Sequence, residues 1–257
     1  MLPDGSNPEG VDPDPPLNWT KDTFTKASVV LYGVQGSPPL CKIITYLKYF
    51  KIAYEHRATG GKKGSSYTKM PVMDVGDRQV NDSAIITKFL IPAMIGLKEF
   101  NEDWEKTITF TIHPSVETEV VNDSASCIAW VTGPGGLGMP KPAAWLMSGM
   151  LRRLITKNLA GNPLNTVEDP KIALTRFMEG VGKNKFFGGS APCQVDLSLY
   201  GTLAVFIVQR VPSMLALLDA CRMWPWLLEM DACVPLREIN PNAKVFDLRE
   251  LANGRDK

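Results

Sequence analysis

The segment YTKMPVMDVGDRQVNDSAIITKFL, residues 67–90, carries the clearest folding signal in the chain. Two short runs with strand-forming residues, 71–75 and 78–81, flank a Gly-Asp pair that is typical of a tight β-hairpin turn. Asp82 and Ser83 have side chains that cap helices, and the apolar residues after them favour a helix that begins there. The segment therefore predicts two antiparallel strands followed directly by a helix.

The residues before this segment predict the rest of a small α/β unit. Residues 27–34 form a run rich in β-branched residues, which favours a buried strand. The sequence QGSPP, residues 35–39, breaks the strand, and apolar residues at helical spacing follow from 40 to 50. Residues 52–57 favour a second strand. The order of elements is therefore β-α-β-β-β-α.

The residues after this unit predict helices. Apolar residues at helical spacing mark three of them, in 145–155, 174–181 and 197–211, and the third is apolar on nearly every side and is expected at the centre. Prolines at 212 and 225 punctuate two shorter helices. Residues 133–142 (GPGGLGMPKP) predict a loop, without the Lys-Ser/Thr step of a phosphate-binding loop.

Composition narrows the classes of function. The 257 residues include 28 Lys and Arg and 27 Asp and Glu, so the formal net charge of +1 argues against a nucleic-acid partner. The apolar runs are too short to span a bilayer, so no transmembrane segment is expected. The sequence is still compatible with peripheral association with a membrane. Two histidines and five scattered cysteines without a CxxC pair argue against a metal site, a Ser-His-Asp triad or a disulfide framework.

The two ends of the chain predict tails. Residues 1–26 are acidic and rich in proline, which favours an extended segment that a protein partner would have to hold in place. The first residues lack the basic and apolar regions of a signal peptide, so a soluble protein of the cytoplasm or an organelle is expected rather than a secreted one. Residues 241–257 are expected to form a second tail.

Four short motifs in a fixed order resemble the glutathione transferases. They are SYTKMPV (66–72), VNDSAII (80–86), FFGG (186–189) and QVDLSLYG (194–201), and together they most resemble the prostaglandin E synthase type 2 branch. The likeness runs from about residue 28 to residue 235, with 99–146 poorly matched. It implies an α/β thioredoxin-like N-terminal domain that binds glutathione (27–95) and an all-α C-terminal domain (96–240).

The resemblance implies roles for two pairs of residues. The Met70–Pro71 peptide is expected to be cis, with the Met70 main chain turned outward to pair with the cysteinyl unit of glutathione. The alternative is that Pro71 merely starts an edge strand. Ser83 and Asp82 are expected to bind the carboxylate and the ammonium of the γ-glutamyl unit at a helix N-terminus. The alternative is an ordinary helix cap.

The sequence GSPPLCK, residues 36–42, departs from the pattern of that branch. Type 2 prostaglandin E synthases and glutaredoxins carry Cys-Pro-x-Cys here, whereas this chain has Ser37 and Leu40 at the two cysteine positions. Ser37 fits serine-type glutathione transferases, in which the hydroxyl group hydrogen-bonds the glutathione sulfur. It equally fits an N-cap before Pro38. Two alternatives exist for Cys41. Either a one-residue insertion brings it into the place of the second cysteine, or it is an inert residue of the first helix.

Two functions of different classes follow. The first is a glutathione-dependent transferase or isomerase that acts on an apolar small molecule, with Ser37 as the catalytic residue. The second is a non-catalytic accessory subunit or scaffold of a larger complex. It is favoured by the missing cysteines and by Cys193, because a capping box with Asp196 usually has Ser or Thr at this position. Haem is implied by the resemblance alone.

Overall fold

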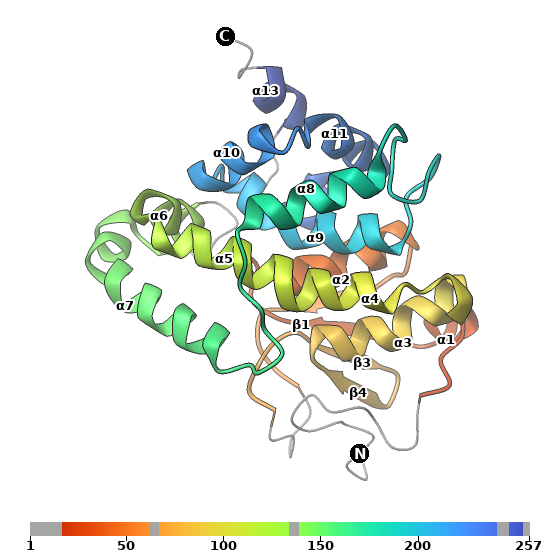
Figure 1. Ribbon diagram of the computed structural model, residues 1–257. Helices are drawn as coiled ribbons and strands as arrows, with labels where there is room; N and C mark the ends of the chain where they lie inside the picture. Colours follow the sequence, from red (N-terminus) through yellow and green to blue (C-terminus); the bar gives the residue numbers. More distant parts are fainter. Residues whose placement is uncertain (1–16, 62–66, 134–138, 241–246, 254–257) are drawn as a thin grey trace.

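The computed structural model describes residues 17–61, 67–133, 139–240 and 247–253, and divides into a small sheet with its own helices and a larger helical half (Figure 1). The strands are β1 (Val29–Tyr32), β2 (Glu55–Arg57), β3 (Val72–Val75) and β4 (Arg78–Asn81). The helical segments are α1 (Lys21–Lys26), α2 (Pro38–Tyr49), α3 (Ser83–Ile95), η2 (Leu97–Glu99), α4 (Glu102–Thr107), η3 (Ile108–Ile112), α5 (His113–Asn122), α6 (Ser124–Thr132), α7 (Lys141–Ala160), α8 (Pro170–Val181), α9 (Gln194–Val208), α10 (Pro212–Ala220), α11 (Trp224–Cys233), α12 (Leu236–Ile239) and α13 (Leu248–Asn253).

The sheet confirms the predicted β-α-β-β-β-α order. Its four strands lie in the order β2-β1-β3-β4, with β1 parallel to β2 and antiparallel to β3. The β3–β4 hairpin turns at Gly76, whose φ of 62° is the left-handed conformation that glycine adopts without strain. This is the thioredoxin-like arrangement, and the all-helical half follows it in the chain as predicted.

The register of the strands brings three segments together at one end of the strands. We call this end of the sheet the sheet edge. Tyr32, at the end of β1, pairs with Val72, at the start of β3, and Val72 pairs with Asn81, at the end of β4. The loop after β1, the peptide before β3 and the start of α3 therefore meet at the same edge.

The centre of the molecule is α9, which packs against α2 (Figure 1). All residues of α9 are buried, as its apolar sequence predicts. Gly201 allows the two helices to approach closely, because a Cβ atom there would lie 2.6 Å from the Cα of Lys42 and 2.6 Å from the Thr45 hydroxyl oxygen. A larger residue at 201 would force the two halves of the fold apart.

A buried ionic network also joins the two halves. Lys42 of α2 forms an ion pair of 2.8 Å with Glu105 of α4, and the two side chains are only 3% and 6% exposed. Lys42 Nζ also donates to the Thr109 hydroxyl at 2.8 Å, and Gln194 Nε2 donates to the second oxygen of Glu105 at 2.8 Å. Both charges are therefore hydrogen-bonded as well as paired, as buried charges need to be.

Two expectations from the sequence need correction, and one helix differs from the usual pattern. Part of the expected N-terminal tail forms α1, and its Phe24 is buried and packs edge-on against Trp19. Part of the expected C-terminal tail forms α13, with Leu248 buried. The apolar residues of α7 do not all face the core, because Leu146 and Trp145 are 76% and 68% exposed. Residues 1–16 of the first tail, and the partner expected for it, lie outside the described residues.

The start of α9 keeps its capping box despite the unusual N-cap. The Asp196 carboxylate accepts a hydrogen bond from the Cys193 N–H at 2.9 Å, and others from the main chain of Phe187 and Gly188. It also accepts from the indole of Trp226 at 2.9 Å. Cys193 therefore starts the helix as a serine or threonine would, and the motif is intact. Within the described ranges, no helix is long and apolar enough to cross a membrane.

Candidate functional site

The sheet edge described above holds every residue that the sequence predicts for the site. Ser37 lies in the loop after β1, Met70 and Pro71 precede β3, and Asp82 and Ser83 start α3. The strand register places these three segments side by side. Their assembly is a property of the fold, because they are up to 46 residues apart in the chain.

The Met70–Pro71 peptide bond is cis, as predicted. Pro71 is buried and its carbonyl oxygen accepts a hydrogen bond of 3.1 Å from the Asp82 N–H, which ties the peptide to the start of α3. β3 lies between β1 and β4, so Pro71 does not start an edge strand. Among the described residues, the main-chain N–H and C=O of Met70 have no main-chain partner.

Asp82 is the N-cap of α3, and its side chain accepts a hydrogen bond of 2.8 Å from the Ala84 N–H. Its other carboxylate oxygen lies 3.4 Å from the Tyr67 hydroxyl, and burial together with the Asp82 charge raises the pKa of that tyrosine. The backbone of Asp82 has a φ of 76°, a conformation that costs a non-glycine residue about 1–3 kcal/mol and is concentrated at functional sites. Ser83 follows as the first helical residue and is buried.

Ser37 stands at the N-cap of α2, but its side chain makes no capping hydrogen bond. The first two helical residues, Pro38 and Pro39, have no N–H to donate, and the Leu40 N–H at the third position makes no hydrogen bond with this side chain. A helix N-terminus usually stabilises an anion through exposed N–H groups and the helix dipole. Here two of those groups are missing. Ser37 therefore keeps its hydroxyl group free of a capping role, in a half-buried position where the helix offers less help than usual.

Two side chains hold the loop before Ser37 from opposite elements. His56 of β2 lies with Nε2 at 2.8 Å from the Gly33 carbonyl oxygen. Trp130 of α6 donates from its indole nitrogen to the Gly36 carbonyl oxygen at 3.0 Å. Trp130 is 5% exposed and packs edge-on against Phe206 of α9. The helical half thus fixes the loop that carries Ser37.

Cys41 does not have the environment of a reactive thiol. It lies in α2 and is 2% exposed. Burial raises the pKa of its thiol to about 12, and a backbone hydrogen bond from Gly36 offsets this only in part. A reactive cysteine needs an accessible group with a lowered pKa. Cys41 is therefore the inert helix residue of the two alternatives considered above.

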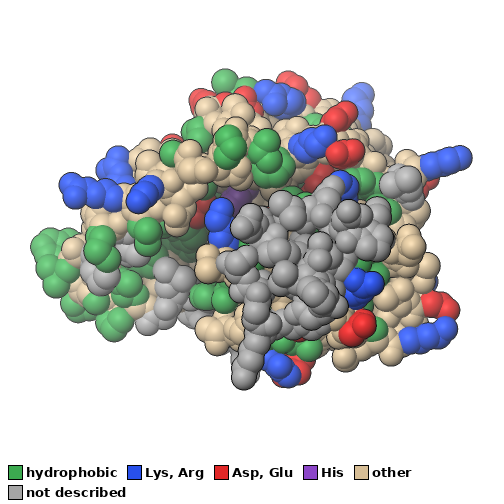
Figure 2. Space-filling view, turned by 90° about the horizontal axis from the view of Figure 1, so that it is seen from below, with side chains coloured by type: hydrophobic (Ala, Val, Ile, Leu, Met, Phe, Trp, Pro, Cys, Tyr) green, Lys and Arg blue, Asp and Glu red, His purple; other side chains and the backbone are tan. Residues whose placement is uncertain are grey.

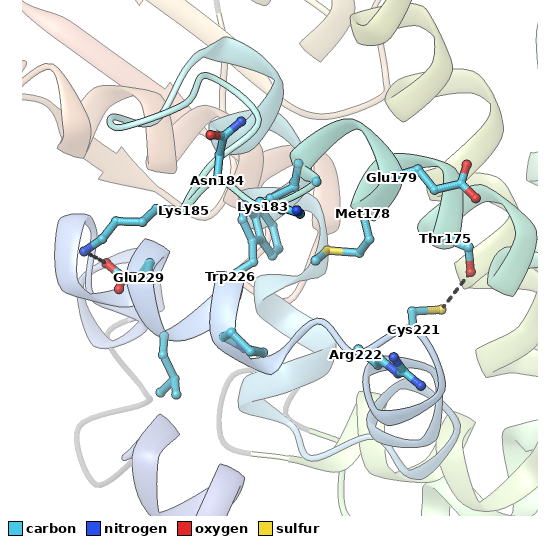
Figure 3. A pocket seen from close by; sticks show the side chains of 14 residues that line it. Thr175, Met178, Glu179, Lys183, Asn184, Lys185, Cys221, Arg222, Trp226 and Glu229 are labelled. Carbon is cyan, nitrogen blue, oxygen red and sulfur yellow. Dashed lines mark hydrogen bonds and ion pairs between the residues drawn. The ribbon is translucent and has the colours of Figure 1, made fainter.

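Two of the cavities in the described structure are lined by other residues. One of about 690 Å³ is a groove between α8 and α11, where Met178 and Trp226 form an apolar floor (Figure 3). Lys185 and Glu229 form an ion pair of 3.1 Å at its rim. The other, of about 160 Å³, lies between α3 and α4. Neither is lined by the predicted site residues. Within the described part of the chain, no cluster of three or more potential metal ligands occurs.

Sequence reasoning missed two parts of this region. Trp130 lies in residues 99–146, where the family motifs are poorly matched, so nothing marked it as a support for Ser37. The Lys42–Glu105 pair joins residues 63 positions apart, and each alone reads as a surface charge. Among the family motifs, SYTKMPV and VNDSAII pointed to ligand contacts at this edge.

Comparison with known proteins supports the fold. The chain is similar to a solved glutathione S-transferase I with bound lactoylglutathione, with 17% identity and a TM-score of 0.52, over 84% of this chain and 100% of the other. It is also similar, at a TM-score of 0.43, to the theta-class glutathione S-transferase of Xanthomonas axonopodis pv. citri with glutathione bound, with 12% identity over 83% of this chain and 97% of the other. The epsilon-class glutathione S-transferase of Musca domestica matches with 17% identity and a TM-score of 0.43, over 89% of this chain and 99% of the other. No protein-family model and no curated protein matches the chain.

Proposed function

We propose that the chain binds glutathione along the edge of its sheet and acts as a glutathione-dependent transferase. The observation that carries this proposal is the alignment, at one edge, of the Ser37 loop, the cis Met70–Pro71 peptide and the Asp82–Ser83 helix start. In this reading, residues 27–95 form the glutathione-binding domain, and residues 96–240 form the helical domain that shapes a pocket for an apolar co-substrate.

The dimensions of the edge suit a tripeptide. Neighbouring strands lie about 4.8 Å apart, so the two steps from β1 to β4 span about 10 Å. An extended tripeptide spans about 10 Å as well. With its γ-glutamyl end at the N-terminus of α3, its cysteinyl unit would pair with the Met70 main chain, and its thiol would reach the loop of Ser37.

The γ-glutamyl end of glutathione carries both a carboxylate and an ammonium group. The N-terminus of α3 favours the carboxylate through its dipole and its first N–H groups, with Ser83 as a hydroxyl donor. Asp82 supplies the negative charge for the ammonium. Its Oδ1 is committed to the Ala84 N–H, which leaves Oδ2, beside Tyr67, as the oxygen that faces the ligand.

Ser37 would act on the glutathione sulfur. Its hydroxyl group donates a hydrogen bond to the thiolate, which favours the charged form and lowers the thiol pKa. The thiolate is then the nucleophile toward an electrophilic, apolar co-substrate held by the helical domain. Because Pro38 and Pro39 supply no N–H groups, the Ser37 hydroxyl carries most of this stabilisation.

The finer assignment to the prostaglandin E synthase type 2 branch, and to an isomerase reaction, rests on the sequence motifs. The buried Cys41 and the Ser37 substitution remove the dithiol of that branch, so a serine-dependent reaction suits the site better. Haem has no part in the proposed reaction.

A second candidate is a glutathione-binding subunit without catalysis. It is favoured by the same pair of prolines, and by the hydrogen bond from Trp130 that holds the Ser37 loop against α6. In this case the sheet edge still binds glutathione, but the pKa of the glutathione thiol stays near its value in water.

Ser37→Ala separates the two candidates. For a transferase, we expect conjugation of glutathione to a chlorodinitrobenzene electrophile, with kcat/KM about tenfold or more lower in Ser37→Ala and the glutathione Kd nearly unchanged. Ser190→Ala, on an exposed loop, is the matched control. Glutathione binding without conjugation in the wild type, and no difference in the ultraviolet absorbance of the thiolate between the two proteins, would favour the second candidate.

A further inference from the structure

Helix α7 carries an exposed apolar stripe on its outer side. Residues four apart in a helix lie nearly above one another, so Leu146, Met150 and Leu154 form one line along α7. Their exposed fractions are 76%, 57% and 51%, although leucine and methionine are usually buried. Trp145, 68% exposed, starts the neighbouring line. We call these four residues and the two basic residues that follow on the second line, Arg153 and Lys157, the α7 face.

The opposite side of α7 accounts for its attachment to the protein. Ala144 is fully buried, and Ile155 packs against the core. α7 contacts α5 and α6 and lies at the side of the molecule (Figure 1). Seen from below, hydrophobic side chains gather at this end of the molecule, with Lys and Arg side chains beside them (Figure 2). One apolar side of α7 therefore packs against the protein, and the α7 face is a second apolar side that points outward.

The charged side chains of α6 and α7 themselves have a single sign. No Asp or Glu occurs from residue 124 to residue 167, whereas Lys141, Arg152, Arg153 and Lys157 are all basic. The chain as a whole has a net charge of only +1, so this concentration is local. Arg152 donates to the neutral amide of Asn122 at 2.7 Å, and within the described ranges none of the four forms an ion pair.

We propose that the α7 face docks onto an anionic lipid surface. Trp and Leu side chains next to Lys and Arg, without acidic residues, are the composition of helices that lie in the plane of a membrane interface. Arg153 and Lys157 can reach the headgroups while the apolar stripe enters the interface. The α7 face of a second copy complements this face less well, because it brings the same positive charges and no acid.

The proposal is independent of glutathione binding and of the family motifs. The α6–α7 hairpin begins in residues 99–146, where those motifs are poorly matched, so the resemblance gives this hairpin no role. The site residues lie on the sheet edge, whereas the α7 face lies on a helix of the helical half. Docking through α7 would therefore leave Ser37 and Ser83 untouched.

Co-sedimentation of the full chain with vesicles tests the proposal. The vesicles are phosphatidylcholine with about one third phosphatidylglycerol, compared with pure phosphatidylcholine. We expect binding to the anionic vesicles that falls with added salt, and a partition coefficient lower by about tenfold or more in Leu146→Ser/Met150→Ser/Leu154→Ser. Arg153→Gln/Lys157→Gln should lower it on anionic vesicles only.

The control variant is Ile172→Ser, which removes a side chain of similar exposure, 56%, from α8. It should bind the vesicles as the wild type does. Two results would overturn the proposal. One is equal sedimentation of wild type and triple variant with anionic vesicles. The other is a wild-type dimer in analytical ultracentrifugation that the triple substitution separates, without vesicle binding, since a second copy would then occupy the face.

Discussion

The indole nitrogen of Trp130 donates a hydrogen bond of 3.0 Å to the main-chain oxygen of Gly36. It joins α6, in the helical half, to the residue directly before Ser37. The loop of the proposed catalytic residue is thus positioned by the other half of the fold, in addition to its own sheet.

Trp130→Phe is expected to lower the free energy of unfolding by about 1–3 kcal/mol, because it leaves the Gly36 oxygen without its buried donor. Urea unfolding measures this change. Trp145→Phe, which alters an exposed tryptophan, should change it by less than about 0.5 kcal/mol. Equal losses in the two variants would mean that the Gly36 contact contributes nothing.

The buried Lys42–Glu105 pair makes stability depend on pH. Burial by itself raises the pKa of Glu105, but the Lys42 charge and the hydrogen bonds from Lys42 and Gln194 more than offset this, so that the pKa lies below the ordinary 4.5. A carboxyl group with a lowered folded-state pKa stabilises the fold above its unfolded-state pKa, and this contribution disappears as the pH falls through the folded-state value.

Glu105→Gln should therefore cost stability at pH 7, and the gap between wild type and variant should narrow as the pH falls below 4.5. Lys42→Met leaves a buried carboxylate without its partner, and we expect a loss of about 3–5 kcal/mol at pH 7. Thermal unfolding across the pH range measures both. A gap that stays constant from pH 7 to pH 3 would contradict the assignment of the ion pair.

The cysteines should react in a fixed order. Burial raises the pKa values of Cys41 and Cys193 to about 12 and about 11. Burial also raises the pKa of Cys233, but the side chain of this residue is exposed to the reagent. Alkylation of the native protein near pH 8, followed by mass spectrometry, should label Cys233 first, and Cys41 only after unfolding. Cys233→Ser should remove the fast reaction. Rapid labelling of Cys41 in the native protein would restore the thiol chemistry that its burial argues against.

Pro39→Ala restores an N–H group at the second residue of α2. If the Ser37 loop holds a thiolate, this additional donor and the helix dipole should lower the pKa of bound glutathione, and the thiolate fraction at neutral pH should rise by about tenfold. Thiolate absorbance measures it. Pro212→Ala adds an N–H group at the first residue of α10 and should have no effect. An unchanged absorbance in Pro39→Ala would place the sulfur away from α2.

Local signals were sufficient to predict the sheet and the positions of α2, α3 and α7 to α11, but not those of α1, α4 to α6, α12 and α13. The Gly76 turn and the Asp82 cap act within a few residues, so they can be read directly from the sequence. The Trp130–Gly36 hydrogen bond and the Lys42–Glu105 pair depend on contacts between distant segments, which no local pattern records. The periodicity of α7 predicted a helix, but the period is the same whether an apolar side meets the core or faces outward.

Calorimetric titration of glutathione into the wild type, Ser83→Ala and Asp82→Asn tests the central claim most directly. Asparagine keeps the helix cap and tolerates the left-handed backbone of Asp82, so this variant removes the charge alone. We predict saturable micromolar to millimolar binding to the wild type, weakened about tenfold in each variant. No detectable heat from the folded wild type at several millimolar glutathione, or equal affinity in all three proteins, would contradict a glutathione site at this edge.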